Sequence, residues 1–88
     1  MSNGKRALIV GRNITIARKL AGMNQAQLGR IIGVPTSYLS EWEAGNHEPR
    51  SAALERIGDA LDQPLWWFYR DHAAEAELDA QRRAAAAA

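Results

Sequence analysis

The chain has 88 residues, no cysteine, and a formal net charge of +1 that conceals a basic half at 1–40 and an acidic half at 41–88. This length allows one domain with a single modest core, which argues against an enzyme with a buried cleft, and the missing cysteine excludes disulfides and thiolate metal sites. The longest apolar run near the N-terminus, 7–10, is too short for a signal peptide or a membrane span, so we expect a cytoplasmic protein with no metal, cofactor or membrane partner.

Apolar residues recur at helical spacing along most of the chain, and no segment shows the sustained alternation of a strand. We expect a first helix to begin near Leu8 or Val10. Gly22 is suited to end it, because glycine adopts the left-handed conformation that closes many helices.

Residues 24–33 and 36–44 predict the second and third helices. Asn24 is a good N-cap, with a glutamine three residues later at the capping-box position. The hydroxyl of Thr36 or Ser37 is expected to cap the third helix, because serine and threonine satisfy the first unpaired N–H groups.

Two further helices and a tail complete the expected order. A fourth helix should begin at Arg50 or Ser51 and break at 62–64, where a proline follows an aspartate and a glutamine. A short fifth helix then carries the aromatic residues. The remainder, 71–88, is rich in alanine and is expected to be helical or frayed.

The apolar residues of each helix should face a common core. The four aromatic residues in 66–69 cannot all be buried in one short helix, so one or two should stay exposed. An exposed aromatic patch marks an interface, and we therefore expect a homodimer through the region 64–80. The residues predicted to point inward are Ile14, Ala17, Met23, Leu28, Ile32, Leu39, Trp42, Leu54, Ile57 and Leu61.

Residues 25–44 have the pattern of a helix-turn-helix, two short helices joined by a turn of three or four residues. Gly29 is small where the two helices must approach closely. Gly33 permits the positive φ that the sharp turn needs. Together these spacings are a strong indication of the motif.

With these residues in place, the chain resembles the Cro/repressor-type (Xre) helix-turn-helix proteins of phages and bacteria, from about Val10 to Phe68. The resemblance implies an all-α, compact five-helix lambda-repressor-like DNA-binding domain at 1–70, with an Ala-rich tail at 71–88. It also implies a structural ion pair between Arg18 and Glu43. The chain departs from the family pattern at Pro35, Trp42 and Glu48. The motifs that carry the resemblance are Val10-Gly11…Ile14…Arg18, Asn24-Gln25-x-x-Leu28, Gly33-Val34, Ser37-Tyr38-Leu39-Ser40, Glu43-x-Gly45, Pro49, and Ile57…Ala60-Leu61 followed by a short aromatic-bearing helix.

In such proteins the third helix reads base edges in the major groove with its N-terminal residues. If Leu39 faces the core, the outward side chains of 36–44 are Thr36, Ser37, Ser40 and Glu41. Hydroxyl groups donate or accept, and a carboxylate accepts from the cytosine amino group. Because no Arg, Asn or Gln is present among them to form a bidentate contact with guanine or adenine, specificity is expected to be spread over several weak contacts and DNA shape.

Phosphate contacts are expected around that helix, partly by family position and partly because the second helix directs its first N–H groups outward. Lys5 and Arg6 are expected to form a short N-terminal basic arm that reaches the adjacent backbone or a minor groove, the alternative being a disordered start. The predicted phosphate-binding residues are Asn24, Gln25, Tyr38, Asn46, His47 and Arg50.

The sequence therefore predicts a sequence-specific regulator of transcription, of phage or bacterial repressor type, bound to double-stranded DNA as a homodimer. The alternative is an antitoxin-like module that uses the same fold to bind a partner protein. No small-molecule effector is expected, because a second domain is missing. Catalysis is not expected either, since the chain has no Ser/His/Asp grouping and no phosphate-binding glycine loop.

Overall fold

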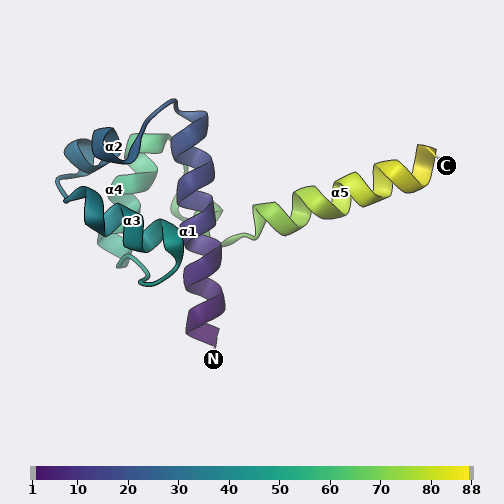
Figure 1. Cartoon of the computed structure of the whole chain (residues 1–88), viewed down its shortest axis with the longest axis horizontal. Helices are drawn as coiled ribbons and strands as arrows, with labels where there is room; N and C mark the ends of the chain where they lie inside the picture. The colour runs from purple at the N-terminus through teal and green to yellow at the C-terminus, as the bar shows by residue number, and fades with distance from the viewer. Residues whose placement is uncertain (1, 88) are drawn as a thin grey trace.

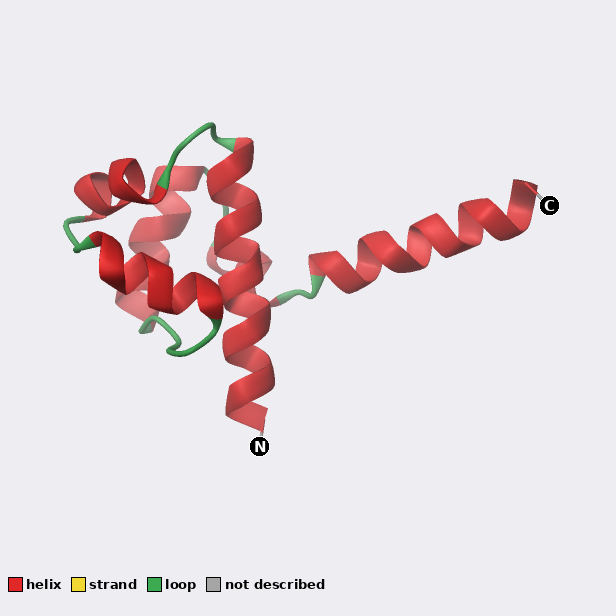
Figure 2. Ribbon diagram, in the orientation of Figure 1, coloured by secondary structure: helices red, strands yellow, loops and turns green. Residues whose placement is uncertain are grey.

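The computed structural model describes residues 2–87, and all of the regular elements in this range are helices (Figure 2). The all-α prediction is therefore confirmed. Four α-helices and one short 3₁₀-helix pack together, and a last helix projects from them (Figure 1). The elements are α1 (Ser2–Leu20), α2 (Gln25–Ile32), α3 (Thr36–Ala44), α4 (Ser51–Leu61), η1 (Leu65–Tyr69) and α5 (His72–Ala87).

The core lies between α1, α2, α3, α4 and η1, and every helix that lines it contributes apolar residues at helical spacing. The inward prediction is confirmed for all the aliphatic residues named above, whereas Met23 and Trp42 are only partly buried. The core residues are Val10, Ile14, Ala17, Leu28, Ile32, Leu39, Leu54, Ile57, Leu61 and Phe68.

Helix α1 begins at Ser2, so the predicted start near Leu8 or Val10 is wrong. The extra turns are stabilised by contacts with distant parts of the chain. Ala7 is buried, and the Arg6 guanidinium lies 3.1 Å from Glu48 and 4.6 Å from the centre of the Tyr69 ring. These partners are far away in sequence, which is why local patterns did not reveal them.

The turn between α2 and α3 has the predicted geometry, with Gly33 in the turn and Gly29 where the two helices approach closely. Gly33 has φ 76° and closes α2 in the left-handed conformation. Gly29 is buried at the crossing, where an added methyl group would lie 2.8 Å from the Val34 carbonyl oxygen. The predicted capping box at the start of α2 is also present, with Asn24 and Gln27 exchanging hydrogen bonds of 2.8 Å.

The predicted cap of α3 is wrong, because the N-cap position belongs to Pro35 and no side chain caps the helix. Pro35 is extended, with φ −62° and ψ 150°, so Thr36 and Ser37 already lie inside the first turn. The hydroxyls of these two residues therefore remain available to groups outside the helix.

Among residues 4–87, Asn13 is the one buried polar residue, at 1% exposure. Its Nδ2 donates to the carbonyl oxygens of Phe68, at 2.7 Å, and Arg70, at 2.6 Å. These carbonyls belong to the end of η1, where a 3₁₀-helix leaves acceptors without partners. Asn13 therefore holds η1 against α1.

Helix α5 has no buried residue and projects away from the other helices (Figure 1). It is not a continuation of η1, because Arg70 is extended between them. Asp71 accepts from the Ala74 N–H at 3.1 Å and Arg70 pairs with Glu75 at 3.0 Å, so the start of α5 is held by local contacts. None of the helices within 2–87 combines the length and apolar character that a membrane crossing requires.

Replacing Asn13 with alanine is expected to destabilise the protein by about 1–3 kcal/mol, because buried carbonyl oxygens lose their donor. The free energy of unfolding in urea measures the effect. Arg12→Ala, an exposed neighbour on α1, is the control and should change stability by less than about 0.5 kcal/mol. Equal effects of the two substitutions would contradict the assigned role of Asn13.

Candidate nucleic-acid interface

Helix α3 presents its polar side chains to solvent and its apolar ones to the core. Leu39 is fully buried, whereas the four residues predicted to read bases are all exposed. The tight turn after α2 and the buried Leu39 together fix the rotation of α3 about its axis. The exposed residues of the first two turns are Thr36, Ser37, Ser40 and Glu41.

Glu43 lies at the end of α3 and joins three helices. Its Oε2 accepts from Arg18 Nε at 2.8 Å, and its Oε1 accepts from Arg18 Nη2 at 2.9 Å, so the guanidinium binds in a two-pronged manner. Oε1 also accepts from Thr15 at 2.9 Å and from Gln25 at 3.1 Å. Since Thr15 and Arg18 belong to α1 and Gln25 to α2, one carboxylate fixes α3 against both helices.

These hydrogen bonds shift the pKa values of Glu43 and Arg18 in opposite directions. Burial alone would raise the pKa of Glu43, but the hydrogen bonds from Arg18, Gln25 and Thr15 outweigh burial and hold it below its ordinary value of 4.5. The hydrogen bond to Glu43 raises the pKa of Arg18, against the opposing effect of desolvation. The pair is therefore charged at neutral pH, with side-chain exposures of 11% for Arg18 and 7% for Glu43.

The predicted phosphate-binding residues of α2 lie at its exposed N-terminus. Asn24 uses its side-chain oxygen as the cap of α2. Gln25 is half-buried and directs its amide to Glu43, so its side chain is already engaged. The capping hydrogen bond leaves the first N–H groups of α2 as the remaining donors at this end.

Glu41 belongs to a polar cluster at the end of the exposed face of α3 that Thr36, Ser37 and Ser40 also form. Asn46 donates to Glu41 Oε2 at 3.1 Å, and His47 Nε2 lies 4.0 Å from the same oxygen. All three residues are exposed. Asn46 therefore orients the carboxylate, although both side chains remain accessible.

A surface groove of about 580 Å³ runs between α3 and the start of α4. Tyr38, 54% exposed, forms one wall, with its ring edge-on to Trp42 at 5.9 Å. The structure thus brings the α3 residues and the loop residues to one face. Residues from both predicted sets line this groove, namely Ser37, Tyr38, Glu41, His47 and Arg50.

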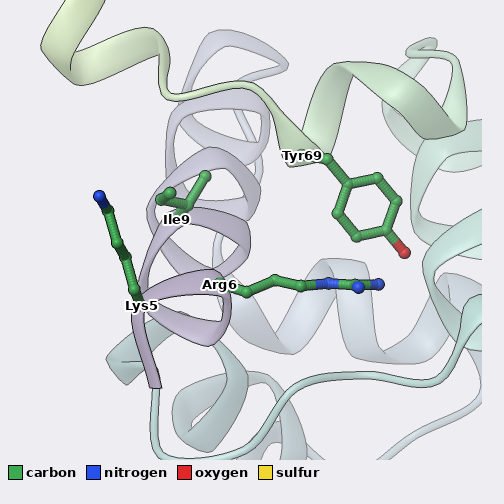
Figure 3. A pocket seen from close by; sticks show the side chains of 4 residues that line it. All are labelled: Lys5, Arg6, Ile9 and Tyr69. Carbon is green, nitrogen blue, oxygen red and sulfur yellow. The ribbon is translucent and has the colours of Figure 1, made fainter. Parts of the chain in front are cut away.

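Lys5 and Arg6 do not form the predicted arm, because both lie in the helical part of α1. They line a separate hollow of about 380 Å³ with Ile9 and Tyr69 (Figure 3). Arg6 extends toward the Tyr69 ring, and the Arg6 guanidinium forms an ion pair with Glu48. This hollow shares no lining residue with the groove beside α3.

The supporting roles of two residues of α1 were not predicted from the sequence, although one of them, Gly11, belongs to a family motif. Thr15 donates to Glu43, and its spacing of three residues from Arg18 places both on one helix face. Gly11 lies where α1 crosses α3, and an added methyl group there would collide with the Trp42 carbonyl oxygen. The helical spacing of Thr15 from Arg18 is readable from the sequence, whereas the crossing at Gly11 requires the fold.

Comparison with known proteins places this arrangement in a family. Residues 14–68 match the family model described as helix-turn-helix. The HTH-type transcriptional regulator y4aM of Sinorhizobium fredii is 34% identical over 64 residues, which cover 73% of this chain and 45% of the relative. YazB of Bacillus subtilis, another HTH-type regulator, is 38% identical over 56 residues, 64% of this chain and 81% of YazB. The chain thus spans less than half of the Sinorhizobium relative.

Solved structures share the fold. The clp gene regulator ClgR of Corynebacterium glutamicum superimposes with a TM-score of 0.72 and 25% identity, over 91% of this chain and 85% of ClgR. The hypothetical transcription factor NHTF from Neisseria has a TM-score of 0.73 and 19% identity, over 83% of this chain and 84% of NHTF. The five-helix arrangement with its helix-turn-helix is therefore confirmed.

Replacing Glu43 with glutamine is expected to cost about 3 kcal/mol at neutral pH, because the mostly buried Arg18 loses its counter-charge. Since the pKa of Glu43 is lowered in the folded state, its contribution is present above about pH 4.5 and is lost as the pH falls through the folded pKa. The difference between wild type and variant should therefore shrink in acid. Urea unfolding between pH 7 and pH 3 measures this.

The control is Glu55→Gln on the exposed side of α4. Its unfolding free energy should stay within about 0.5 kcal/mol of the wild type at pH 7. A Glu43→Gln variant whose stability follows the wild type at a constant offset over the whole pH range would contradict the role given to the carboxylate.

Proposed function

The chain belongs to the Xre-type helix-turn-helix family, and on that premise we propose that it is a transcriptional regulator that binds specific sites in double-stranded DNA. The observation that carries the proposal is the outward polar face of α3, held in place by Leu39 and by the Glu43 network. A helix presented in this way enters the major groove of B-DNA with its first turns toward the bases.

Base reading falls to Thr36, Ser37, Ser40 and Glu41. The uncapped start of α3 leaves the two hydroxyls in the first turn available to base edges and phosphates. Asn46 holds the Glu41 carboxylate, which can accept a hydrogen bond from a cytosine amino group. Short side chains make weak individual contacts, so DNA shape contributes a large share of the specificity.

Phosphate contacts surround this helix. The N–H groups at the start of α2 and the exposed Asn24 lie at one end, and the loop residues lie at the other. Arg50 is the arginine that lines the groove beside α3 and carries a permanent positive charge there. The exposed Tyr38 in the same groove adds a hydroxyl donor. The other proposed contacts are made by the backbone N–H of Gln25, whose side chain is engaged by Glu43, and by the side chains of Asn46 and His47. They position the protein without reading sequence.

The regulator acts as a homodimer through the region 64–80, on an operator with two-fold symmetry. Trp66 is 58% exposed and Leu78 is 47% exposed, and both are large apolar side chains within this region. Two copies would place their α3 helices about 34 Å apart, one turn of DNA. Repression, by occupation of promoter DNA, is the regulatory effect we propose.

Exposed α5 is also what an antitoxin-like module would use to hold a partner protein. Sequence-specific DNA binding requires the exposed polar face of α3, whereas binding of a partner protein through α5 does not. Selection of bound duplexes from a random pool tests the proposal directly, because it yields both the motif and the half-site spacing. A pool that returns no enriched sequence would overturn sequence-specific DNA binding.

Glu41→Gln is expected to relax the preference at one base pair, at which cytosine is favoured, by about 1–3 kcal/mol. The amide keeps the size of the side chain but adds donors to a group that only accepts. Competition binding with single-base operator variants measures the change. Unaltered discrimination at every position would remove Glu41 from the reading set.

Arg50→Ala is expected to weaken binding by a similar factor on all sequences and to reduce the slope of log K against log salt by about one unit. Fluorescence anisotropy between low and physiological salt measures the slope. Arg83→Ala on the exposed surface of α5 is the matched control, since it removes the same charge away from α3. An identical slope in both variants would remove Arg50 from the phosphate contacts.

A further inference from the structure

Helix α5 lacks the packing that normally stabilises a helix. It has 16 residues and therefore a length of about 24 Å, and none of its residues is buried. In proteins most helical stability comes from burying one face, and isolated helices of this length are marginal in water. Leu78, its only large apolar residue, is 47% exposed near the middle of the helix. The helix thus presents an apolar contact that the rest of the chain does not cover.

A hollow that could receive such a helix lies beside α1. The hollow between Lys5, Arg6, Ile9 and Tyr69 has an apolar floor made by Ile9 and the Tyr69 ring, and a basic rim (Figure 3). Arg6 is already engaged by Tyr69 and Glu48. Lys5 extends beside Ile9, away from the Tyr69 ring, and forms no ion pair with any residue among 4–87.

The charges of the two helices are complementary. Helix α1 carries five basic residues and no acid, whereas the first half of α5 carries three acids and no base. Two of those acids have partners, since Glu75 pairs with Arg70 and Asp79 with Arg82. Glu77 has no ion pair within the described part of the chain, which matches the position of Lys5 on the other helix.

The helix cannot reach the hollow of its own chain. Only Arg70 and Asp71 separate η1 from α5, and two extended residues span about 7 Å. The ion pair between Arg70 and Glu75 and the Asp71 cap fix the direction in which α5 leaves. That direction points away from α1 (Figures 1 and 2). A copy of α5 that fills this hollow would therefore come from another molecule.

We propose that α5 of one copy docks on the Lys5–Tyr69 hollow of a second copy, in a reciprocal exchange about a two-fold axis. Leu78 covers Ile9 and Tyr69, and the acidic half of α5 faces Lys5. Such an interface is isologous, so each contact occurs twice. The inference rests on the homodimer of the proposed function and extends its interface from 64–80 to Lys5 and Ile9 of α1.

The test uses two full-length variants with reversed charge, Lys5→Glu and Glu77→Lys. Each alone should weaken self-association by about tenfold, because two attractive contacts per dimer become repulsive. An equimolar mixture of the two should associate with wild-type affinity, since each variant restores the attraction to the other. Sedimentation equilibrium without DNA measures the dissociation constants, and circular dichroism checks that both variants keep their helix content.

Glu55→Lys on α4 is the matched control for a change of the same charge on an exposed helix, and it should leave the dissociation constant unchanged. Leu78→Asp tests the apolar contact and should weaken association by more than about tenfold. Wild-type association by both charge variants, or a mixture no tighter than either variant alone, would overturn the proposal. A wild-type chain that stays monomeric at all concentrations would also overturn it.

The affinity of the wild type for a single half-site is measured in parallel. It reports DNA binding by one copy and is separate from association without DNA. Half-site binding with no exchange between the charge variants rejects the docking surface and leaves the proposed function standing. Exchange between the variants with no DNA binding rejects the function and supports the docking surface.

Discussion

The carboxylate of Glu43 is the contact on which the arrangement of the reading helix depends. It accepts four hydrogen bonds from three side chains, and those side chains belong to α1 and α2. Any rotation of α3 about its axis would break the two-pronged contact with Arg18. The exposed face of α3 is therefore held by a carboxylate near the end of the same helix, so the proposed reading of DNA depends on contacts that also stabilise the fold.

Helix α1 is the scaffold against which α3 is positioned. Gly11 lets the backbone of α3 approach closely, and Arg18 pairs with Glu43. Two residues along the helix from Gly11, Asn13 holds the end of η1. A buried polar group stabilises a fold only when its partners are supplied, and for both Asn13 and Glu43 they are. The helix thus positions the reading helix and the origin of α5 with two polar contacts inside an apolar interface.

Much of this could be predicted from local sequence. Gly33, the capping box at Asn24 and the apolar spacing of the helices are short-range signals, so the helix-turn-helix was predictable. The start of α1 was not, because its first turns depend on contacts of Arg6 with Glu48 and Tyr69, which are distant in sequence. Asn13 was missed for a similar reason, since a single polar residue among apolar ones does not reveal which carbonyl it meets. Pro35 displaced the expected cap because it occupies the position that a hydroxyl would need.

The uneven charge of the chain takes on a structural meaning in this arrangement. Of the basic residues before position 41, Arg18 is neutralised by Glu43 and Arg6 by Glu48, so neither adds much to the field that attracts DNA. The reading face itself carries the negative charge of Glu41. Electrostatic attraction supplies most of nonspecific binding to DNA, and here it is diminished at the surface proposed to meet the bases. In the proposed homodimer, affinity would then come from joining two α3 helices on one operator, because a second binding event within a dimer is favoured by its high effective concentration. The acidic half of α5, which lowers the net charge, would then favour DNA binding indirectly if it holds the two copies together.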